Sequence, residues 1–349
     1  MELYNLGKAS WEESQLIYHA LARLGREALV LVSPASPYVC LGFHQDAEQE
    51  VDLEFCRSRQ IPVFRREVGG GAVYLDGDQL FFQLVMRRDH PAIPMKKENF
   101  YRKFLEPVIN TYRRIGIEAE YKPINDVLAG GRKISGTGVG EIGDCLIFVG
   151  NLILDFNYQM MSRILKAPDE KFRDHVYKTL EENMTTIRRE LGEEQAGQWA
   201  ETDLNAIMVE EFENVLDPFS LGGMDDVLAK KVAELGKWMF EPEWLMRKGR
   251  RLSHREVKIR QGVVVMERTH KARGGLIRAG FEVREGRLSN LAISGDFFCY
   301  PSDSVDRLAD ALEGRSRDEV PRALADFYRR YEPETPGISQ EDWLEVFQL

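Results

Sequence analysis

The chain is 349 residues long, more than one hydrophobic core usually supports, so its length predicts two domains. Its net charge of −10 argues against a general nucleic-acid binder, because phosphate recognition requires a basic surface. The longest apolar runs, such as residues 81–86, are too short to span a bilayer, and the first residues lack the pattern of a signal peptide. We therefore expect a soluble cytoplasmic protein that neither enters a membrane nor binds nucleic acid.

Helices and strands alternate over the first 156 residues. Ser10 followed by Glu13 forms a capping box, and apolar residues at helical spacing continue to Gly25, which predicts a first helix. A short helix is expected at residues 53–59, and an amphipathic helix runs from Tyr101 to a glycine at 116. Strands are predicted at residues 29–32, 38–43, 63–66, 72–75, 80–86, 125–129, 133–135 and 146–156.

The remainder of the chain divides into a helical stretch and a second, smaller sheet. Residues 158–235 have a mainly helical pattern, and the composition changes near Lys237 and Trp238. The pattern then predicts antiparallel strands at residues 257–259, 263–269, 276–283 and 288–293, and helices at 304–312 and 319–331. We therefore predict one domain over residues 1–236 and a smaller α+β domain over residues 237–349.

Three consecutive glycines follow two arginines in residues 65–71, RREVGGG. Glycines let the backbone approach a ligand closely, and successive N–H groups can form a concave anion site. Arg65 and Arg66 carry planar, permanently charged donors suited to phosphate, but on a strand they point to opposite faces. The pattern is neither a Walker A loop nor a dinucleotide-binding fingerprint. It fits a phosphate site and a plain glycine-rich hairpin equally well.

A second glycine-rich segment surrounds Lys133, in residues 125–138, NDVLAGGRKISGTG. A turn places Lys133 at the start of a strand, followed by small residues that a ligand can approach. A lysine there could bridge a carboxylate and a phosphate and offset their mutual repulsion. A lysine after a hairpin turn is, however, commonly a solvated surface residue. The segment alone does not decide between the two.

Two further groups of residues have both a chemical and a structural interpretation. Asp76 and Asp78 could help to hold Mg²⁺, or they could simply shape a turn. The four cysteines are widely spaced without a C-x-x-C pair, which predicts reduced thiols rather than disulfides or a zinc site. Cys145 has no histidine nearer in sequence than His175 on its C-terminal side, so the pattern favours a structural thiol over a nucleophile.

Together these segments resemble the lipoate–protein ligase family, in its long form with a C-terminal accessory domain. The family pattern is R-R-x-x-G-G-G-x-V-x-x-D, then N-D, then G-x-K-[IV]-[SA]-G-[ST], then a strand with a glycine near its start. The matching segments are residues 65–76, 125–126, 132–137 and 150–154. Their order and spacing agree over most of the first 200 residues.

The resemblance implies an α+β fold: a biotin/lipoate-ligase-like catalytic domain with a mixed sheet flanked by helices, and a smaller C-terminal α+β domain. It also implies that lipoate reacts with ATP, supplied with Mg²⁺, to give lipoyl-AMP, and that the lipoyl group then passes to a lysine of an acceptor protein. The acceptors implied are lipoyl domains of 2-oxoacid dehydrogenases, the glycine cleavage H protein or a related carrier. The metal ligands stay unassigned.

The resemblance also assigns roles to individual residues. Lys133 would be catalytic and would contact both ATP and lipoate. The remaining implied ATP-binding residues are Arg66, Gly71, Ala72, Val73, Tyr74, Gln79, Asn125 and Asp126. The remaining implied lipoate-binding residues are Arg65, Gly69, Gly70, Ser135, Gly136, Thr137 and Gly150.

The chain departs from the family pattern at several positions, which keeps other functions open. Leu75 stands where histidine is common, Val149 and Asn151 replace parts of an H-G-T pattern, and Gly138 stands where alanine is usual. These changes bear on the acyl group and the acceptor more than on adenylation. One alternative is an octanoyl or lipoyl transferase that needs no ATP, which commonly works through a cysteine thioester. Another is a non-catalytic protein that binds lipoyl domains.

Overall fold

The computed structural model describes residues 1–94, 97–248, 257–260 and 263–347. The contacts between residues divide the chain into two compact units. The first contains residues 1–40, 52–64 and 73–241, and the second contains residues 41–51, 65–72 and 242–349. Neither unit is one continuous stretch, so the single domain boundary after residue 236 stays a prediction.

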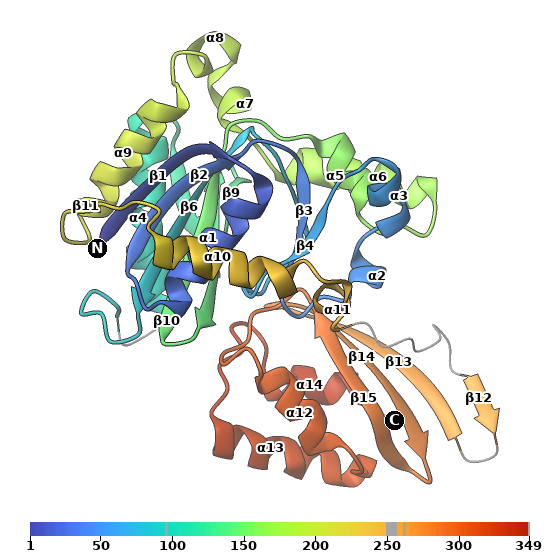
Figure 1. Cartoon of the computed structure of the whole chain (residues 1–349). Coiled ribbons are helices and arrows are strands. Elements are labelled where there is room, and N and C mark those ends of the chain that lie inside the picture. Colours follow the sequence, from blue (N-terminus) through green and yellow to red (C-terminus); the bar gives the residue numbers. More distant parts are fainter. Residues whose placement is uncertain (95–96, 249–256, 261–262, 348–349) are drawn as a thin grey trace. The chain divides into compact units, whose positions relative to one another are not determined.

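The first unit contains a mixed sheet of eight strands in the order β11-β1-β2-β6-β10-β9-β8-β7 (Figure 1). The pairs β11/β1 and β1/β2 are parallel, and the other neighbours are antiparallel. The central strands β2, β6 and β10 are almost wholly buried, as their continuous apolar runs require. The strands are β1 (Glu2–Ala9), β2 (Ala28–Pro34), β6 (Gln79–Arg87), β7 (Ala119–Lys122), β8 (Asp126–Ala129), β9 (Arg132–Ile142), β10 (Cys145–Ile153) and β11 (Ser220–Leu221).

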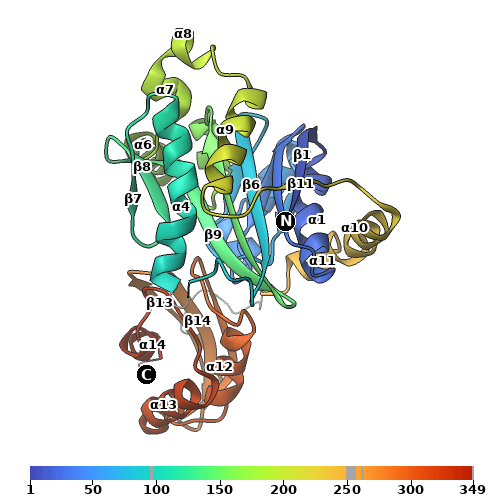
Figure 2. The same ribbon diagram turned by 90° about the vertical axis from the view of Figure 1, so that its left-hand side faces the viewer.

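Helices cover both faces of this sheet. Figure 2 shows α4 and α9 together on one side, while α1 and α10 lie together on the other. A small second sheet has the order β4-β3-β5. Its strands are β3 (Tyr38–Leu41), β4 (Val63–Arg65) and β5 (Val73–Leu75). The helices are α1 (Trp11–Arg23), α3 (Leu53–Ser58), α4 (Lys97–Arg114), α5 (Tyr158–Ile164), α6 (Glu170–Asn183), α7 (Ile187–Leu191), α8 (Glu193–Ala196), α9 (Glu201–Glu213) and α10 (Asp226–Met239).

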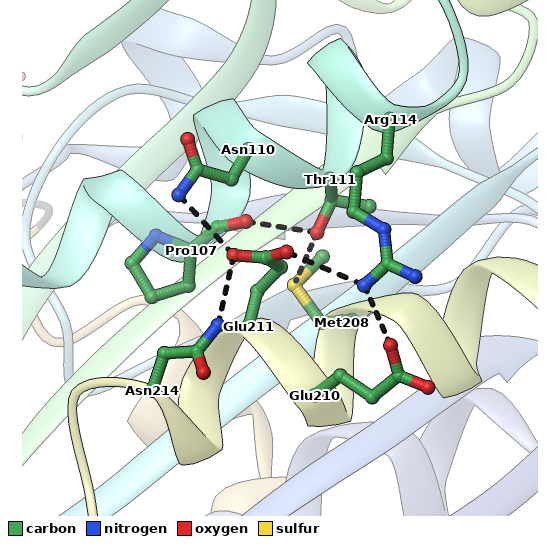
Figure 3. A network of polar contacts seen from close by, with 8 residues as sticks. All are labelled: Pro107, Asn110, Thr111, Arg114, Met208, Glu210, Glu211 and Asn214. Atoms are coloured by element: carbon green, nitrogen blue, oxygen red, sulfur yellow. Dashed lines mark hydrogen bonds and ion pairs between the residues drawn. The ribbon is translucent and has the colours of Figure 1, made fainter.

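A polar network joins α4 to α9 (Figure 3). Its centre is the carboxylate of Glu211, a residue that is only 8% exposed. This carboxylate accepts hydrogen bonds from Asn110 Nδ2 at 3.2 Å, Asn214 Nδ2 at 3.4 Å and Arg114 Nη1 at 3.3 Å. Arg114 also pairs with the exposed Glu210 at 2.6 Å. Because the buried carboxylate is satisfied from three sides, the network fixes how the two helices pack.

The second unit is built on an antiparallel sheet of four strands in the order β12-β13-β14-β15. Helices α12, α13 and α14 surround a core with Trp343 and Phe281 among its most buried side chains. The strands are β12 (Val257–Arg260), β13 (Val263–Ala272), β14 (Gly275–Arg284) and β15 (Arg287–Gly295). The helices are α2 (Ala47–Glu50), α11 (Pro242–Leu245), α12 (Ser304–Leu312), η1 (Arg317–Glu319, a 3₁₀ turn), α13 (Val320–Tyr331) and α14 (Gln340–Val346).

Two segments from the first quarter of the sequence belong to the second unit. In residues 41–51, Glu50 forms an ion pair with Arg278 of β14 at 3.0 Å. The same segment accepts a hydrogen bond from the N–H of Gly295 at the carbonyl of His44, over 3.0 Å. In residues 65–72, the N–H of Gly70 donates to the carbonyl of Phe297 at 3.2 Å. The triple glycine therefore contacts the end of the C-terminal sheet.

The structure confirms the α+β prediction and most of the predicted elements. The expected helix at residues 304–312 is α12, and the mainly helical stretch contains α5 to α10. The sequence patterns missed β1 and β7, which are short of apolar residues, and the glycine-rich second half of β9. These segments form strands because their backbones pair with neighbouring strands. Within the described part of the chain, no helix combines the length and apolarity that crossing a bilayer demands.

The α4–α9 network predicts unequal effects of two adjacent substitutions. Glu211→Ala removes the buried carboxylate that accepts all three hydrogen bonds and should lower the free energy of unfolding by about 1–3 kcal/mol. Glu210→Ala removes an exposed ion pair and should cost less than about 1 kcal/mol. Urea titration of the two variants and the wild type measures both values. Equal losses in the two variants would contradict the central place given to Glu211.

Candidate active site

Lys133 and Asp126 face each other across the β8–β9 hairpin. Lys133 Nζ lies 2.7 Å from Asp126 Oδ1, and the two side chains are 35% and 30% exposed. The hairpin forms because Gly130 and Gly131 both adopt positive φ angles, +54° and +77°, which glycine accepts at little cost. The ammonium group is thus held in place while part of it still faces solvent. This is the arrangement expected of a group that meets an anionic ligand.

The backbone around Lys133 is anchored by two residues from distant segments. The N–H of Thr185, in the loop after α6, donates to the carbonyl of Lys133 at 2.8 Å. The hydroxyl of Tyr112 in α4 donates to the carbonyl of Ile134 at 2.7 Å and accepts from the N–H of Ile153 at 3.2 Å. Burial raises the pKa of Tyr112, so its hydroxyl keeps the proton that it donates. These contacts restrain the strand that carries the lysine.

The small residues that follow Lys133 are also tied to their neighbours. Thr137 Oγ1 donates to the carbonyl of Asn125 at 2.6 Å, and Asn125 Nδ2 donates back to the carbonyl of Thr137. Ser135 is fully buried, and its hydroxyl donates to the carbonyl of Asn151 at 2.6 Å. Asn125, Ser135 and Thr137 therefore each donate a side-chain hydrogen bond to a backbone carbonyl of the protein itself.

Gly150 in β10 leaves room for an aromatic ring. A Cβ atom there would lie 2.4 Å from Cζ of Phe82 and 2.8 Å from Cγ2 of Thr137. Such distances are far inside van der Waals contact, so any larger residue would displace the ring. The glycine is required by packing inside the sheet, whatever its part in binding lipoate.

In the second unit, Arg65 is completely buried and its guanidinium is surrounded by backbone carbonyls. Nη1 donates to the carbonyls of Gly42, Phe43 and Gln45, at 3.0, 3.0 and 2.6 Å. Nε donates to the carbonyl of Leu245 at 3.0 Å. A second carbonyl near Nε, that of Trp244, lies at 3.2 Å, and the indole of this tryptophan donates to the carbonyl of residue 65 at 2.9 Å. A guanidinium group whose donors are occupied by backbone carbonyls is typical of a structural arginine.

Arg66 points elsewhere, as the alternation along a strand requires. Its Nη2 donates to the carbonyls of Gly69 at 2.7 Å and Gly71 at 3.0 Å, so it folds over the triple glycine. Gly70 has a φ of +91°, which only glycine adopts readily. A Cβ atom on Gly69 would lie 2.7 Å from the carbonyl oxygen of Phe297. The glycines are therefore needed for the loop conformation and for its close approach to the C-terminal sheet.

The predicted site residues fall in both units. Arg65, Arg66, Gly69, Gly70, Gly71 and Ala72 belong to the second unit. Val73, Tyr74, Gln79, Asn125, Asp126, Lys133, Ser135, Gly136, Thr137 and Gly150 belong to the first. The ligand assigned to each of these residues stays a prediction.

A cavity of about 360 Å³ in the first unit is lined by acidic and aromatic side chains, including Asp76, Asp78 and Asp155. Asp76 Oδ1 accepts the N–H of Asp78 at 3.1 Å, as a turn residue does. Burial raises the pKa of Asp76. Across the described ranges, no three His, Cys, Asp or Glu side chains are grouped so that they could hold a metal ion. The contacts of Asp76 therefore fit the turn interpretation.

The comparison with protein families decides the assignment. The family model of the lipoyl protein ligase A/B catalytic domain matches residues 9–213. The chain belongs to this family. A second model, described as the bacterial lipoate protein ligase C-terminus, matches residues 264–347.

Relatives of this lipoyl protein ligase A/B member differ in their named activities. Lipoate–protein ligase 1 of Staphylococcus aureus is 24% identical over 300 residues, 83% of this chain and 82% of its own length. An octanoyltransferase LipM of Oceanobacillus iheyensis is 25% identical over 176 residues, 46% of this chain and 64% of its own. Family membership thus gives an enzyme of the ligase and transferase group without choosing between the two reactions.

Solved structures of the family have the same catalytic fold. A bipartite lipoate protein ligase from Thermoplasma acidophilum, studied with its E2 lipoyl domain, has a TM-score of 0.63 at 25% identity. The alignment covers 72% of this chain and 98% of that one. A lipoate-protein ligase A bound with ATP has a TM-score of 0.58 at 23% identity, over 70% of this chain and 98% of that one, and shows likeness of fold.

Two buried cysteines of this family member, Cys56 and Cys145, are poorly suited to act as nucleophiles. All four cysteines are buried, and Cys145 lies at the start of β10, inside the sheet. Burial raises the pKa of Cys145, and it raises the pKa of Cys56 to about 11. The thiolate form, which attacks an acyl group, is therefore scarce near neutral pH at both positions.

Some residues that shape the site were not assigned roles from the sequence. Thr185 and Tyr112 act through single hydrogen bonds to the lysine strand, from segments with no motif of their own. Asn151 stood out only as a departure from the family pattern. Its side chain contacts the strand of Lys133, because Asn151 Oδ1 accepts the N–H of Gly136 at 3.0 Å. The departure from the family pattern at Asn151 was the one sign in the sequence that this residue has a special part in the site.

The contacts of Arg65 and Arg66 predict that the two arginines respond differently to replacement by lysine. Arg65→Lys loses most of the bonds to buried carbonyls and should lower the free energy of unfolding by about 3 kcal/mol or more. Arg66→Lys disturbs two bonds within one loop and should cost under about 1.5 kcal/mol. Chemical denaturation checks both values. An Arg65→Lys protein of wild-type stability that binds lipoate weakly would instead support a direct ligand contact.

Proposed function

We propose that this chain is an ATP-dependent lipoate–protein ligase. A carboxylate oxygen of lipoate attacks the α-phosphorus of ATP, and pyrophosphate leaves to give lipoyl-AMP. The neutral amine of an acceptor lysine then attacks the acyl carbon, loses a proton and displaces AMP. ATP enters as its Mg²⁺ complex, and the acceptor is a lipoyl domain or a related carrier protein.

The observation that carries this proposal is the placement of Lys133. In adenylation two anions must approach each other, and an ammonium group between them offsets their repulsion. Lys133 Nζ is held by Asp126 at 2.7 Å, on a strand anchored at the carbonyls of Lys133 and Ile134. The ammonium is thus positioned before any ligand arrives. Its partial exposure lets a carboxylate and a phosphate reach it.

The relatives and the glycine-rich loop support the nucleotide part of the proposal. A lipoate-protein ligase A of the same fold has been solved with ATP bound, and the S. aureus relative is named a lipoate–protein ligase. Arg66 and the backbone N–H groups from Gly71 to Tyr74 are the groups that we assign to the phosphates and the nucleotide. Arg65 is less suited to lipoate than the sequence suggests, because its donors are occupied by carbonyls.

The octanoyltransferase alternative rests on the similarity to LipM. A thioester route would need an accessible thiol with a low pKa. The buried cysteines, with raised pKa values for Cys145 and Cys56, oppose that route. The ligase reaction needs no cysteine, and this is the reason for preferring it.

Lipoate-dependent exchange between ATP and labelled pyrophosphate tests the adenylation step by itself. Wild-type protein should catalyse it, and Lys133→Ala should lower the rate by about 100-fold or more, because the charge between the anions is lost. Lys230→Ala, at an exposed position of α10, is the matched control and should keep the rate.

The same assay separates the cysteine route from the ligase. Cys145→Ser should leave the exchange rate within about twofold of the wild type, because the buried thiol has no part in adenylation. Absence of exchange from folded wild-type protein, together with ATP-independent octanoyl transfer that Cys145→Ser abolishes, would replace the ligase with a transferase.

A further inference from the structure

A chain of three hydrogen bonds connects the strand of Lys133 to the segment that follows the triple glycine. The N–H of Gly136 donates to Asn151 Oδ1 at 3.0 Å. Asn151 Nδ2 donates to Gln79 Oε1 at 2.9 Å, and Gln79 Nε2 donates to the carbonyl of Tyr74 at 3.2 Å. Gln79 is 1% exposed and Asn151 is 9% exposed, so the chain runs through the interior of the first unit.

The direction of this chain is fixed at both ends. A backbone N–H, here that of Gly136, can only donate, and a carbonyl, here that of Tyr74, can only accept. The side chains of Asn151 and Gln79 lie between these two groups, so each must accept one hydrogen bond and donate another. A carboxamide does both, whereas an ionised carboxylate only accepts. Bonds aligned in this way polarise one another and are strengthened by the low dielectric of the interior.

One end of the chain lies directly under the catalytic ammonium group. A Cβ atom on Gly136 would lie 3.4 Å from Cε and 3.7 Å from Nζ of Lys133, so the lysine side chain rests on this glycine. The same hypothetical atom would lie 4.0 Å from Asn151 Oδ1. Ser135 adds a second bond to the backbone of Asn151, at 2.6 Å. The position of Asn151 therefore sets the surface on which the ammonium group lies.

The other end reaches the segment assigned to the nucleotide. The carbonyl of Tyr74 belongs to β5, next to the backbone that would contact ATP. This backbone carbonyl accepts the hydrogen bond from Gln79 Nε2 at 3.2 Å. The two carboxamides are the direct link between the nucleotide segment and the lysine strand.

We propose that Gln79 and Asn151 are positioning residues that hold the Lys133 ammonium and the Tyr74 segment in register for adenylation. The proposal rests on the ligase function inferred above and adds to it a requirement for a carboxamide at both positions. It also gives Gln79 a role apart from direct contact with ATP. Asn151, which departs from the family pattern, accepts from Gly136 and donates to Gln79.

The test uses Gln79→Glu, which preserves shape but removes a donor. The ionised carboxylate would face the carbonyl of Tyr74, whereas its protonated form would donate to it and restore the chain. The Gln79 side chain also bonds Asp76 of the adjacent turn, where Asp78 is a second acid. Lys133 and Asp126 are the charged groups near the other end of the chain of hydrogen bonds. Because Asp76 is itself partly buried and can titrate, the wild-type profile over the same pH range is the reference.

The matched control is Gln83→Glu on the same strand. Gln83 is 2% exposed and donates through Nε2 to the carbonyl of Ser14 at 2.7 Å, but it does not belong to the chain. Its replacement creates the same conflict between a carboxylate and a carbonyl. Residues 79 and 83 point to the same face of β6, because side chains alternate along a strand.

The measured quantity is the rate of lipoate-dependent ATP–pyrophosphate exchange per folded protein, from pH 6 to pH 8.5, with thermal unfolding recorded at each pH. Gln79→Glu should be at least about tenfold slower than wild type at the alkaline end and should recover as the pH falls. Gln83→Glu should follow the wild-type profile. Asn151→Asp, which keeps the bond to Gly136 and loses the one to Gln79, should repeat the alkaline loss if Gln79→Glu does not fold.

Identical profiles for the variants at positions 79 and 83, relative to wild type, would overturn the proposal and leave Gln79 and Asn151 as ordinary buried residues. A loss for Gln79→Glu that is equal at every pH would also overturn it, because protonation would then fail to restore the link. Wild-type protein without lipoate-dependent exchange would contradict the ligase function itself. These results are distinct, so failure of the inference is separable from failure of the function.

Discussion

The ion pair between Lys133 and Asp126 is the interaction on which the account of this protein depends. Its two side chains are partly exposed, and such pairs contribute little to stability. For the proposed adenylation, the importance of this pair lies in its position, because that reaction requires a cation between two approaching anions. The surrounding structure fixes the position of Lys133. Thr185 and Tyr112 donate hydrogen bonds to the backbone of the lysine strand, and Gly136 lies against the lysine side chain.

The two adjacent arginines illustrate how the same residue type serves different purposes on one strand. Arg65 is turned into the second unit, where its guanidinium holds several carbonyls together. Arg66 is turned the other way, over the triple glycine. The burial of Arg65 also accounts for the membership of residues 41–51 and 65–72 in the C-terminal unit, since its partners Gly42 and Leu245 lie in that unit.

Much of the fold could be predicted from the sequence, because burial leaves a clear pattern. The apolar runs of β2 and β6, the N-cap Ser10 of α1 and the alternation in the C-terminal sheet are all visible in the local sequence. The glycine-rich half of β9 and the polar strands β1 and β7 show no such local pattern, since pairing with distant strands determines them. The hydrophobic periodicity of a segment cannot show which distant strand it will pair with.

The candidate site, like the fold, could be predicted from the sequence only in part. Lys133 and the triple glycine stand out through their motifs, and alternation along the strand predicts opposite directions for Arg65 and Arg66. The burial of Arg65 among backbone carbonyls was not predicted. The roles of Asn151 and Thr185 were not predicted either, because each acts through hydrogen bonds that exist only after folding. A sequence shows which side chains can donate or accept, but the structure shows which groups they meet.

The central claim is that this chain joins lipoate to a protein lysine at the expense of ATP. Mass spectrometry of a lipoyl domain incubated with the protein, lipoate and MgATP tests it most directly. We predict a mass increase of one lipoyl group on the domain, dependent on ATP and accompanied by AMP and pyrophosphate in equal amounts. Modification that proceeds without ATP from an acyl carrier, with no AMP formed, would contradict the claim.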